Sequence, residues 1–93
     1  MIKSFRDKDT ESVFKRKRVR RLSRPVQKVT QRKLDLIEAA EVIEDLRVPP
    51  GNRLEKLSRN RKGQYSIRVN DQWRICFLWQ SGQAVDVEIV DYH

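Results

Sequence analysis

The sequence is poor in the residues on which several classes of protein depend. Its single cysteine excludes an internal disulfide framework and any metal site built from several cysteines. Three glycines are too few for a glycine-rich nucleotide loop, and no apolar run approaches the roughly 20 residues of a membrane helix. The first residues also lack the apolar segment of a secretory signal. These absences predict a protein of the reducing cytoplasm, with no metal, other cofactor or membrane partner.

Positive charge is what the sequence has in excess. Its 93 residues include 21 lysines and arginines against 13 acidic residues, which gives a formal net charge of +8. Hydrophobic residues make up 38% of the chain, enough for one thin core, so residues 1–93 are expected to form a single domain. A basic domain of this size predicts a polyanion as its partner.

The chain is predicted to begin with a short strand and a short helix. Residues 2–5 alternate in the manner of a strand. Residues 9–14 predict a helix with Asp9 or Thr10 as its N-cap.

A second, longer helix is predicted to start after Ser23. Serine caps helices and Pro25 is tolerated in the first turn. We expect this helix to run from residue 26 to about residue 46, with Lys33 interrupting its apolar stripe, and to end at residues 49–51, which are Pro-Pro-Gly. Acidic residues near a helix C-terminus oppose the macrodipole and suggest a basic neighbour; here they are Glu38, Glu41, Glu44 and Asp45.

After residue 51 the hydrophobic period changes to two. Three alternating stretches predict strands that turns at 70–72 and 81–83 join into an antiparallel meander. Matching the apolar faces sets the expected register, with the pairs Val69–Trp73, Ile67–Ile75, Tyr65–Phe77, Trp79–Val85, Phe77–Val87 and Ile75–Ile89. One face of the sheet is expected to pack on the long helix, which gives an α+β domain.

This register places Arg68 opposite Arg74 on the other face of the sheet. Like charges in such a position repel each other, so one interpretation is that an anion lies between them. The alternative is two solvated arginines, with Asp86 or Glu88 as a partner.

The same register brings the last residues of the chain beside Arg74. Val90 is expected next to this arginine and Tyr92 as its diagonal neighbour on the same face. His93 is the only histidine, and hence the only side chain that titrates near neutral pH without special tuning. The alternative for His93 is a frayed and idle chain end.

The aromatic and sulfur side chains of the sheet are expected to be structural. Trp73 and Trp79 alternate in phase with Ile75 and Phe77, which predicts the core rather than base stacking. Cys76 falls out of phase and is expected to be a half-buried strand residue rather than a nucleophile.

Two segments concentrate the positive charge. Residues 14–24 contain no acidic residue, and residues 53–63 carry five basic ones. Together with Arg68 and Arg74, the second segment would make one face positive enough to hold a nucleic-acid backbone. The alternative for each segment is a solvated loop.

Three stretches of the sequence resemble HigB toxins of the RelE/ParE superfamily of bacterial toxin–antitoxin systems. The first is residues 49–55, Pro-Pro-Gly-Asn-Arg-Leu-Glu, and the second is residues 63–77, which include Ser-Ile-Arg-Val-Asn-Asp-Gln-Trp-Arg. The third is residues 87–93, which end in Asp-Tyr-His, and residues 1–5 are similar to the opening strand of the family. The resemblance implies a RelE-like α+β fold in which an N-terminal strand and two helices pack on an antiparallel sheet.

The resemblance also implies a ribosome-dependent endoribonuclease that cuts mRNA in the ribosomal A site without a metal, by attack of the ribose 2′-OH on the adjacent phosphate. Arg74 matches the arginine that stabilises the charged phosphorane, and His93 matches the terminal histidine that acts as general base or acid. Tyr92 is then expected to contact the substrate and help protonate the leaving oxygen, and Asp91 to orient His93 or hold a substrate hydroxyl. Some members carry a histidine and a lysine in the loop before the sheet, where this chain has Glu55 and Ser58.

Glu55 is expected to take the role of the family histidine, and Lys56 or Arg59 that of the family lysine. Arg61, Lys62 and Arg68 complete the expected phosphate-binding set, and Lys15, Arg16, Lys17 and Arg18 are expected to face ribosomal RNA. The partners implied are the 70S ribosome with its mRNA and a HigA-like helix-turn-helix antitoxin, through which alone the toxin would reach operator DNA.

Two alternatives remain open at this level. A ParE-like toxin would inhibit DNA gyrase on the same fold without catalysis. A plain nucleic-acid-binding domain would depend on the basic run at residues 14–24. The Asp-Tyr-His ending beside Arg74 favours the nuclease, because a binding module needs no acid–base group there.

Overall fold

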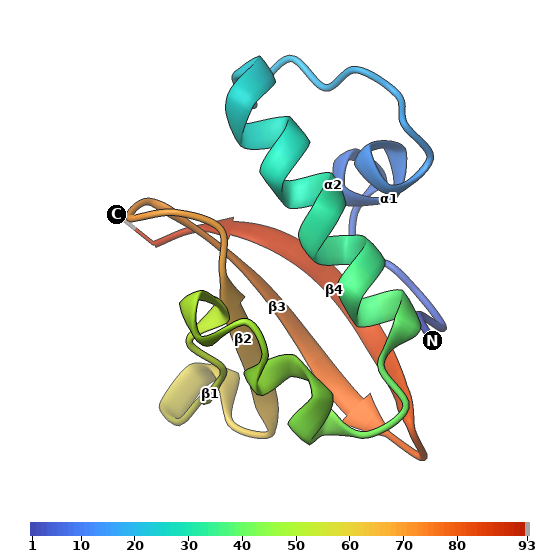
Figure 1. Ribbon diagram of the computed structural model, residues 1–93, viewed down its shortest axis with the longest axis vertical. Coiled ribbons are helices and arrows are strands. Elements are labelled where there is room, and N and C mark those ends of the chain that lie inside the picture. Colours follow the sequence, from blue (N-terminus) through green and yellow to red (C-terminus); the bar gives the residue numbers. More distant parts are fainter. Residues whose placement is uncertain (93) are drawn as a thin grey trace.

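A computed structural model describes residues 1–92 as two helices packed on one face of an antiparallel sheet (Figure 1). The sheet has four strands in the order β1-β2-β3-β4, which are β1 (Glu55–Lys56), β2 (Gln64–Arg68), β3 (Trp73–Gln80) and β4 (Gln83–Asp91). The predicted α+β class and meander are confirmed. The two-residue edge strand β1 was not expected from the sequence.

The register of the first hairpin is confirmed. Tyr65 pairs with Phe77, Ile67 with Ile75, and Arg68 with Arg74. The side chain of Asn70 stabilises the turn, because its Oδ1 accepts hydrogen bonds from the backbone N–H groups of residues 72 and 73.

The second hairpin departs from the predicted register by one residue near its turn. Trp79 pairs with Ala84 rather than Val85, whereas Ile75 still pairs with Ile89. A β-bulge between the two positions absorbs the shift, and within it Asp86 has the positive φ of 54°. The bulge therefore leaves the C-terminal half of β4, which approaches Arg74, in the expected phase.

The N-cap of helix α1 (Lys8–Phe14) lies earlier in the chain than predicted. The cap is Asp7, whose carboxylate accepts a hydrogen bond of 3.2 Å from the backbone N–H of Thr10. The prediction of Asp9 or Thr10 is wrong because Thr10 is fully buried and its hydroxyl donates to Asp7.

Helix α2 (Arg24–Ala39) starts as predicted, with Ser23 as N-cap and proline in the first turn. It ends at Ala39, well before the predicted residue 46, and a 3-10 helix, η1 (Ile43–Arg47), follows. The predicted end at residue 46 is wrong because the backbone becomes extended at Ala40. Leu46 is nevertheless buried and keeps helical spacing, so the sequence pattern does not reveal the break.

Two of the acidic side chains around the end of α2 accept hydrogen bonds from nearby backbone groups. Asp45 accepts hydrogen bonds from the backbone N–H groups of Glu41 and Val42, and these bonds lower the pKa of its carboxyl group. Glu38 accepts from the N–H of Ile2. The N-terminal ammonium group donates a hydrogen bond of 3.2 Å to the carbonyl oxygen of Ala40, so the chain itself supplies a cationic neighbour at this end of α2.

The N-terminal segment lies along the outer edge of β4 (Figure 1). The expected strand at residues 2–5 is reduced to two isolated parallel bridges, Ile2 to Ala84 and Phe5 to Val87. The core lies between the sheet and the helices, and its largest fully buried side chains include Phe77, Leu34, Ile37 and Ile67. Among residues 1–92, none of the helices is long and apolar enough to cross a membrane.

Candidate active site

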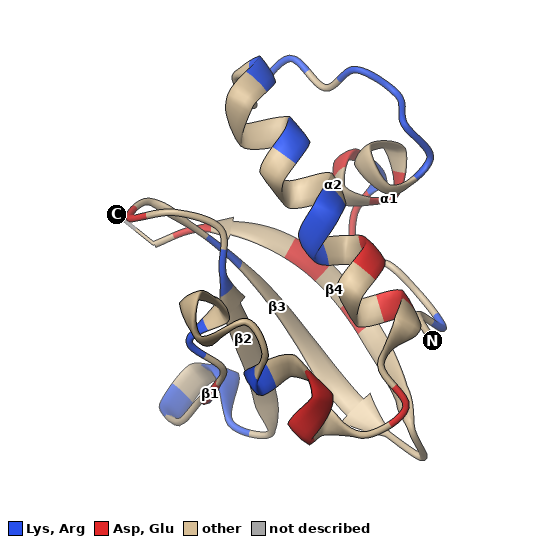
Figure 2. Cartoon of the chain, in the orientation of Figure 1, with Lys and Arg blue, Asp and Glu red and all other residues tan. Residues whose placement is uncertain are grey.

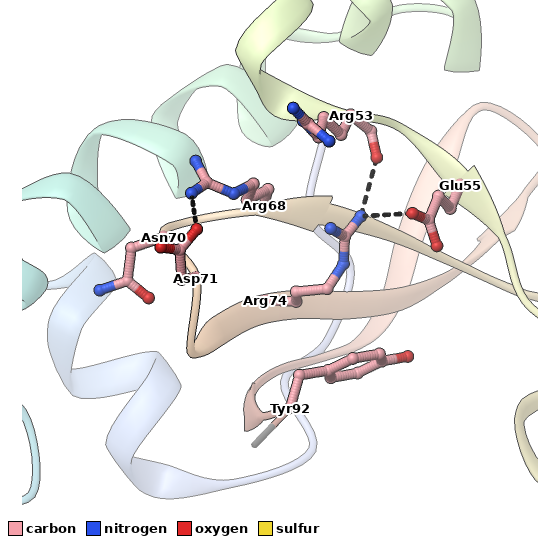
Figure 3. A pocket seen from close by; sticks show the side chains of 7 residues that line it. All are labelled: Arg53, Glu55, Arg68, Asn70, Asp71, Arg74 and Tyr92. Carbon is pink, nitrogen blue, oxygen red and sulfur yellow. Dashed lines mark hydrogen bonds and ion pairs between the residues drawn. The ribbon is translucent and has the colours of Figure 1, made fainter.

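A polar hollow of about 240 Å³ opens on the face of the sheet opposite the core (Figure 3). Strands β2 and β3, the turn between them, the end of β4 and the residues around β1 supply its walls. The lining residues are Arg53, Glu55, Arg68, Asn70, Asp71, Arg74 and Tyr92. Three arginines against two carboxylates make the hollow suited to an anion.

Arg74 forms the floor of the hollow and is held rigidly. Its side chain is largely buried, and Nε donates a hydrogen bond of 2.8 Å to Oγ of Ser66. Its Nη2 donates to the carbonyl oxygen of Arg53 at 2.7 Å and lies 3.9 Å from Oε1 of Glu55 (Figure 3). The guanidinium therefore has a fixed orientation before any ligand binds.

The contacts of Arg74 with Ser66 and with the carbonyl of Arg53 were not predicted from the sequence. Ser66 shares the parity of Arg68 and Arg74 on β2 and β3, so alternation was the signal that could have found it. The carbonyl of Arg53 had no such signal, because it depends on a left-handed backbone, with φ of 45°, in a loop without periodicity.

Arg68 lies opposite Arg74, and its ion pair is formed with Asp71 in the following turn (Figure 3). The suggested partners Asp86 and Glu88 are wrong. Glu88 instead accepts a hydrogen bond of 2.8 Å from Arg61, because both side chains lie farther along this face of the sheet.

Tyr92 lies beside Arg74 as the register predicted. The guanidinium carbon lies 5.8 Å from the centre of the tyrosine ring, a cation–π contact. Burial raises the pKa of the Tyr92 phenol, and the neighbouring Cys76 raises it further. The phenol therefore stays protonated through the neutral range.

Cys76 is fully buried rather than half-buried as expected. Burial raises the pKa of its thiol, although the charge of Arg61 opposes the effect, which agrees with a structural role. Trp73 belongs to the core, and Trp79 packs against it while partly exposed.

Asp91, a residue of the predicted catalytic set, does not line the hollow. Asp91 pairs with Trp73, and its carboxylate accepts a hydrogen bond of 3.1 Å from the side-chain amide of Gln72. Its strand position puts it in phase with the core residue Trp73 rather than with Arg74. The predicted acid–base role of His93 falls on a residue outside the described range, 1–92.

The predicted phosphate-binding residues of the segment before β2 also do not line the hollow. Lys56 lies over the ring of Tyr65, at 6.0 Å, and Arg61 is bound to Glu88 and Gln64. Arg59 and Lys62 are exposed in and after η3 (Arg59–Arg61). Of the expected site, the structure therefore brings together Glu55, Arg68, Arg74 and Tyr92, whose chemical roles stay predictions.

The basic run between α1 and α2 forms a separate surface (Figure 2). Lys15 pairs with Glu11, and Arg16 forms two hydrogen bonds with the carboxylate of Asp35. Arg18 donates to backbone carbonyls and, at 2.8 Å, to the side chain of Gln27. All four residues, including Lys17, are exposed, and none lines the hollow.

Histidine, cysteine, aspartate and glutamate side chains do not gather into a group of three that could hold a metal within the described part of the chain. The side chains that line the hollow carry guanidinium, carboxylate, amide and phenol groups.

The sequence is similar to known bacterial toxins. Residues 3–93 match the family described as "RelE-like toxin of type II toxin-antitoxin system HigB". The chain is 42% identical over 87 residues to Toxin HigB-1 of Vibrio cholerae, covering 92% of each protein. It is 33% identical to Endoribonuclease HigB of Proteus vulgaris over 100% of both chains.

A solved structure shares the fold at low sequence identity. The YoeB-YefM complex from Staphylococcus aureus contains a chain with a TM-score of 0.59 and 18% identity, and the match covers 100% of this chain and 98% of that one. The family match over nearly the whole sequence, the two HigB relatives and the shared fold lead to one conclusion: this chain belongs to the HigB family of RelE-like toxins of type II toxin–antitoxin systems.

Proposed function

We propose that this HigB-family toxin is an endoribonuclease that cleaves mRNA on the ribosome and so arrests translation. The observation that carries the proposal is the fixed guanidinium of Arg74 on the floor of an anion-sized hollow, flanked by Arg68, Glu55 and Tyr92. The name of the Proteus vulgaris relative, Endoribonuclease HigB, supports the reaction class. In this proposal residues 1–93 act as one RelE-like domain in the cytoplasm.

The proposed reaction is a metal-free transesterification. The ribose 2′-oxygen forms a bond to the adjacent phosphorus while the bond from phosphorus to the 5′-oxygen breaks. A general base takes the proton of the 2′-OH and a general acid supplies one to the leaving 5′-oxygen. Arg74 stabilises the negative charge that builds on the phosphoryl oxygens, and its hydrogen bonds to Ser66 and Arg53 spare it any reorganisation during the step.

The proton transfers are assigned to the groups around Arg74. Glu55 has a side chain that is 56% exposed and lies next to the guanidinium, so its carboxylate is placed to accept a proton. Tyr92 is kept protonated by its raised pKa, so its phenol is suited to donate one. His93 remains the third candidate for either role, and Asp91 is proposed to orient it from the neighbouring position.

The proposed partners follow from the family and from the charge. The toxin is neutralised by a cognate antitoxin, which we propose to be a HigA-like helix-turn-helix protein that alone contacts operator DNA. On the 70S ribosome, the exposed surface of Lys15, Arg16, Lys17 and Arg18 faces ribosomal RNA phosphates. Free mRNA should be cut negligibly, since the ribosome positions the substrate.

Pulse labelling after induction of the toxin without an antitoxin tests the proposal. Amino-acid incorporation should fall first, and mRNA bound to ribosomes should acquire new ends. If DNA synthesis falls first while amino-acid incorporation continues, the ParE-like inhibition of gyrase is correct instead. Efficient cutting of naked mRNA would contradict the dependence on ribosomes.

A further inference from the structure

Lys33 is a buried cation with a neutral partner. It lies on α2 with only 8% of its surface exposed, and its Nζ donates a hydrogen bond of 2.5 Å to Oδ1 of Asn52. Among residues 1–92 it forms no ion pair with a carboxylate. Burial lowers the pKa of its ammonium group, and the charges of Arg32 and Arg68 lower it further. A buried charge without a counter-charge costs free energy that an apolar side chain would not.

The partner of Lys33 organises the loop before β1. Asn52 is fully buried, and its Nδ2 donates to the backbone carbonyls of Leu46 and Val48 at 3.1 and 3.3 Å. Lys33 satisfies the one remaining polar atom of this amide. The side chain of Asn52 is therefore fixed on both sides, by α2 and by η1 with the residue that follows it.

The loop so fixed supplies a contact of the candidate active site. The residue after Asn52 is Arg53, whose carbonyl oxygen accepts the hydrogen bond from Nη2 of Arg74 at 2.7 Å. The path from Lys33 to Arg74 thus consists of two hydrogen bonds joined by the side chain of Asn52 and the backbone of residues 52 and 53. A shift of Asn52 moves the Arg53 carbonyl, and with it the direction in which the guanidinium of Arg74 points.

The position of Lys33 also bears on the charge of the hollow. Arg68, whose charge acts on the Lys33 ammonium, lines the hollow together with Arg53 and Arg74. An anion bound there would relieve the repulsion between Lys33 and Arg68. Burying Lys33 would therefore cost less in a complex with a phosphate than in the free protein.

We propose that Lys33 is a positioning residue of this site, which holds the guanidinium of Arg74 toward the scissile phosphate through Asn52 and the carbonyl of Arg53. The inference rests on the proposed cleavage of ribosome-bound RNA. It assigns a role to a residue of α2, an element that contributes no residue to the lining of the hollow.

Lys33→Met tests the proposal, with Lys28→Met as the matched control that removes an exposed lysine from the same helix. Single-turnover cleavage of mRNA on programmed ribosomes, at saturating toxin, should slow by roughly 10- to 100-fold in Lys33→Met, the usual cost of a small misplacement in an active site. Binding to ribosomes that carry a 2′-deoxy mRNA, which cannot react, should change less than about twofold. Lys28→Met should cleave at the wild-type rate.

The second readout is the Nε–H resonance of Arg74 in ¹⁵N-labelled toxin. It should shift or broaden in Lys33→Met and stay unchanged in Lys28→Met, and Lys33→Gln, which retains a donor, should give an intermediate cleavage rate and resonance. If Lys33→Met does not fold, Lys33→Gln alone decides, and a wild-type rate and resonance in it would contradict the proposal.

Two further outcomes would overturn the proposal. One is a wild-type cleavage rate in Lys33→Met. The other is a parallel loss of thermal stability, ribosome binding and cleavage with an unchanged Arg74 resonance, which would indicate a merely structural lysine. If the wild-type toxin itself fails to cleave ribosome-bound mRNA, the proposed function is wrong, while the Arg74 resonance still tests the link from Lys33.

Discussion

Arg68 and Arg74 face each other across β2 and β3, and each has a carboxylate of its own. Asp71 forms an ion pair with Arg68, and Glu55 lies 3.9 Å from Arg74. The two arginines differ in burial, because Arg74 is anchored on the floor by Ser66 whereas Arg68 is more accessible. They should therefore contribute differently, Arg74 to the chemical step and Arg68 to binding.

Replacement of Arg74 by alanine should lower the single-turnover cleavage rate by roughly 10²-fold or more. The same change should lower the free energy of unfolding by about 1–3 kcal/mol, because it leaves buried hydrogen-bonding groups without a partner. Chemical denaturation separates the two effects. Arg74→Lys, which keeps the charge but not the planar fork, should retain part of the rate, and a fully inactive but stable Arg74→Lys would show that the fork is essential.

Arg68→Ala should weaken binding to programmed ribosomes in a salt-dependent manner and leave the saturated cleavage rate nearly unchanged. The reason is that a phosphate contact contributes through counterion release. Binding measured over a range of salt concentrations should show a slope reduced by about one. A loss of affinity that does not depend on salt would indicate a structural role instead.

Tyr92→Phe should retain the contact of the ring with Arg74 and remove the phenol proton. If the phenol protonates the leaving oxygen, cleavage should slow by roughly 10²–10⁴-fold while ribosome binding persists. Because the pKa of Tyr92 is raised, deprotonation of this phenol should lower the wild-type rate only at a pH above the ordinary pKa of tyrosine. His93→Gln is the companion variant, and whichever of the two retains the wild-type rate is excluded as the acid or base.

The pH dependence of stability should reveal the burial of Lys33. Because its pKa is lowered on folding, the unfolded chain binds this proton more tightly than the folded chain. The contribution of Lys33 to the free energy of unfolding should therefore rise as the pH increases from the lowered pKa toward the ordinary lysine pKa of 10.5. Urea denaturation of the wild type and Lys33→Met across this range should show the difference in their free energies of unfolding move in favour of the wild type as the pH rises, and parallel curves would contradict it.

Charge reversal of Lys15 and Lys17 should reduce ribosome association and toxicity together. Lys15 has only an exposed ion pair with Glu11 to lose, so the fold should persist. Arg16 and Arg18 make poorer probes, because they are bound to Asp35 and to Gln27 with nearby carbonyls. Thermal unfolding provides the control, and unchanged ribosome association would refute this surface as the anchor.

The part of the fold and site that follows from hydrophobic alternation was predictable. Parity fixed the first hairpin, the pairing of Arg68 with Arg74, and the approach of Tyr92 to Arg74. The bulge at Asp86 was not predictable, because it depends on contacts with Ser4, more than half the chain away.

Tertiary contacts also explain what was missed on α2 and around the hollow. Lys33 was expected to interrupt the apolar stripe, yet it is buried because Asn52 receives its ammonium group. Backbone acceptors such as the carbonyl of Arg53 leave no trace in a pattern of side chains. The placement of Lys56 beside Tyr65 follows from β1, a strand too short for periodicity to reveal.

The pairing of the N-terminal segment with β4 has a consequence for how the toxin acquires its structure during synthesis. Lys3 donates to the carbonyl of Ala84, and Val87 donates to that of Ser4. Contacts of such high sequence separation form slowly, and this one needs nearly every strand to have been made. The growing chain can thus close this sheet edge, and add Tyr92 to the hollow, only after residues 84–92 have been synthesised. Until then the nascent toxin lacks the geometry that we propose for attack on RNA.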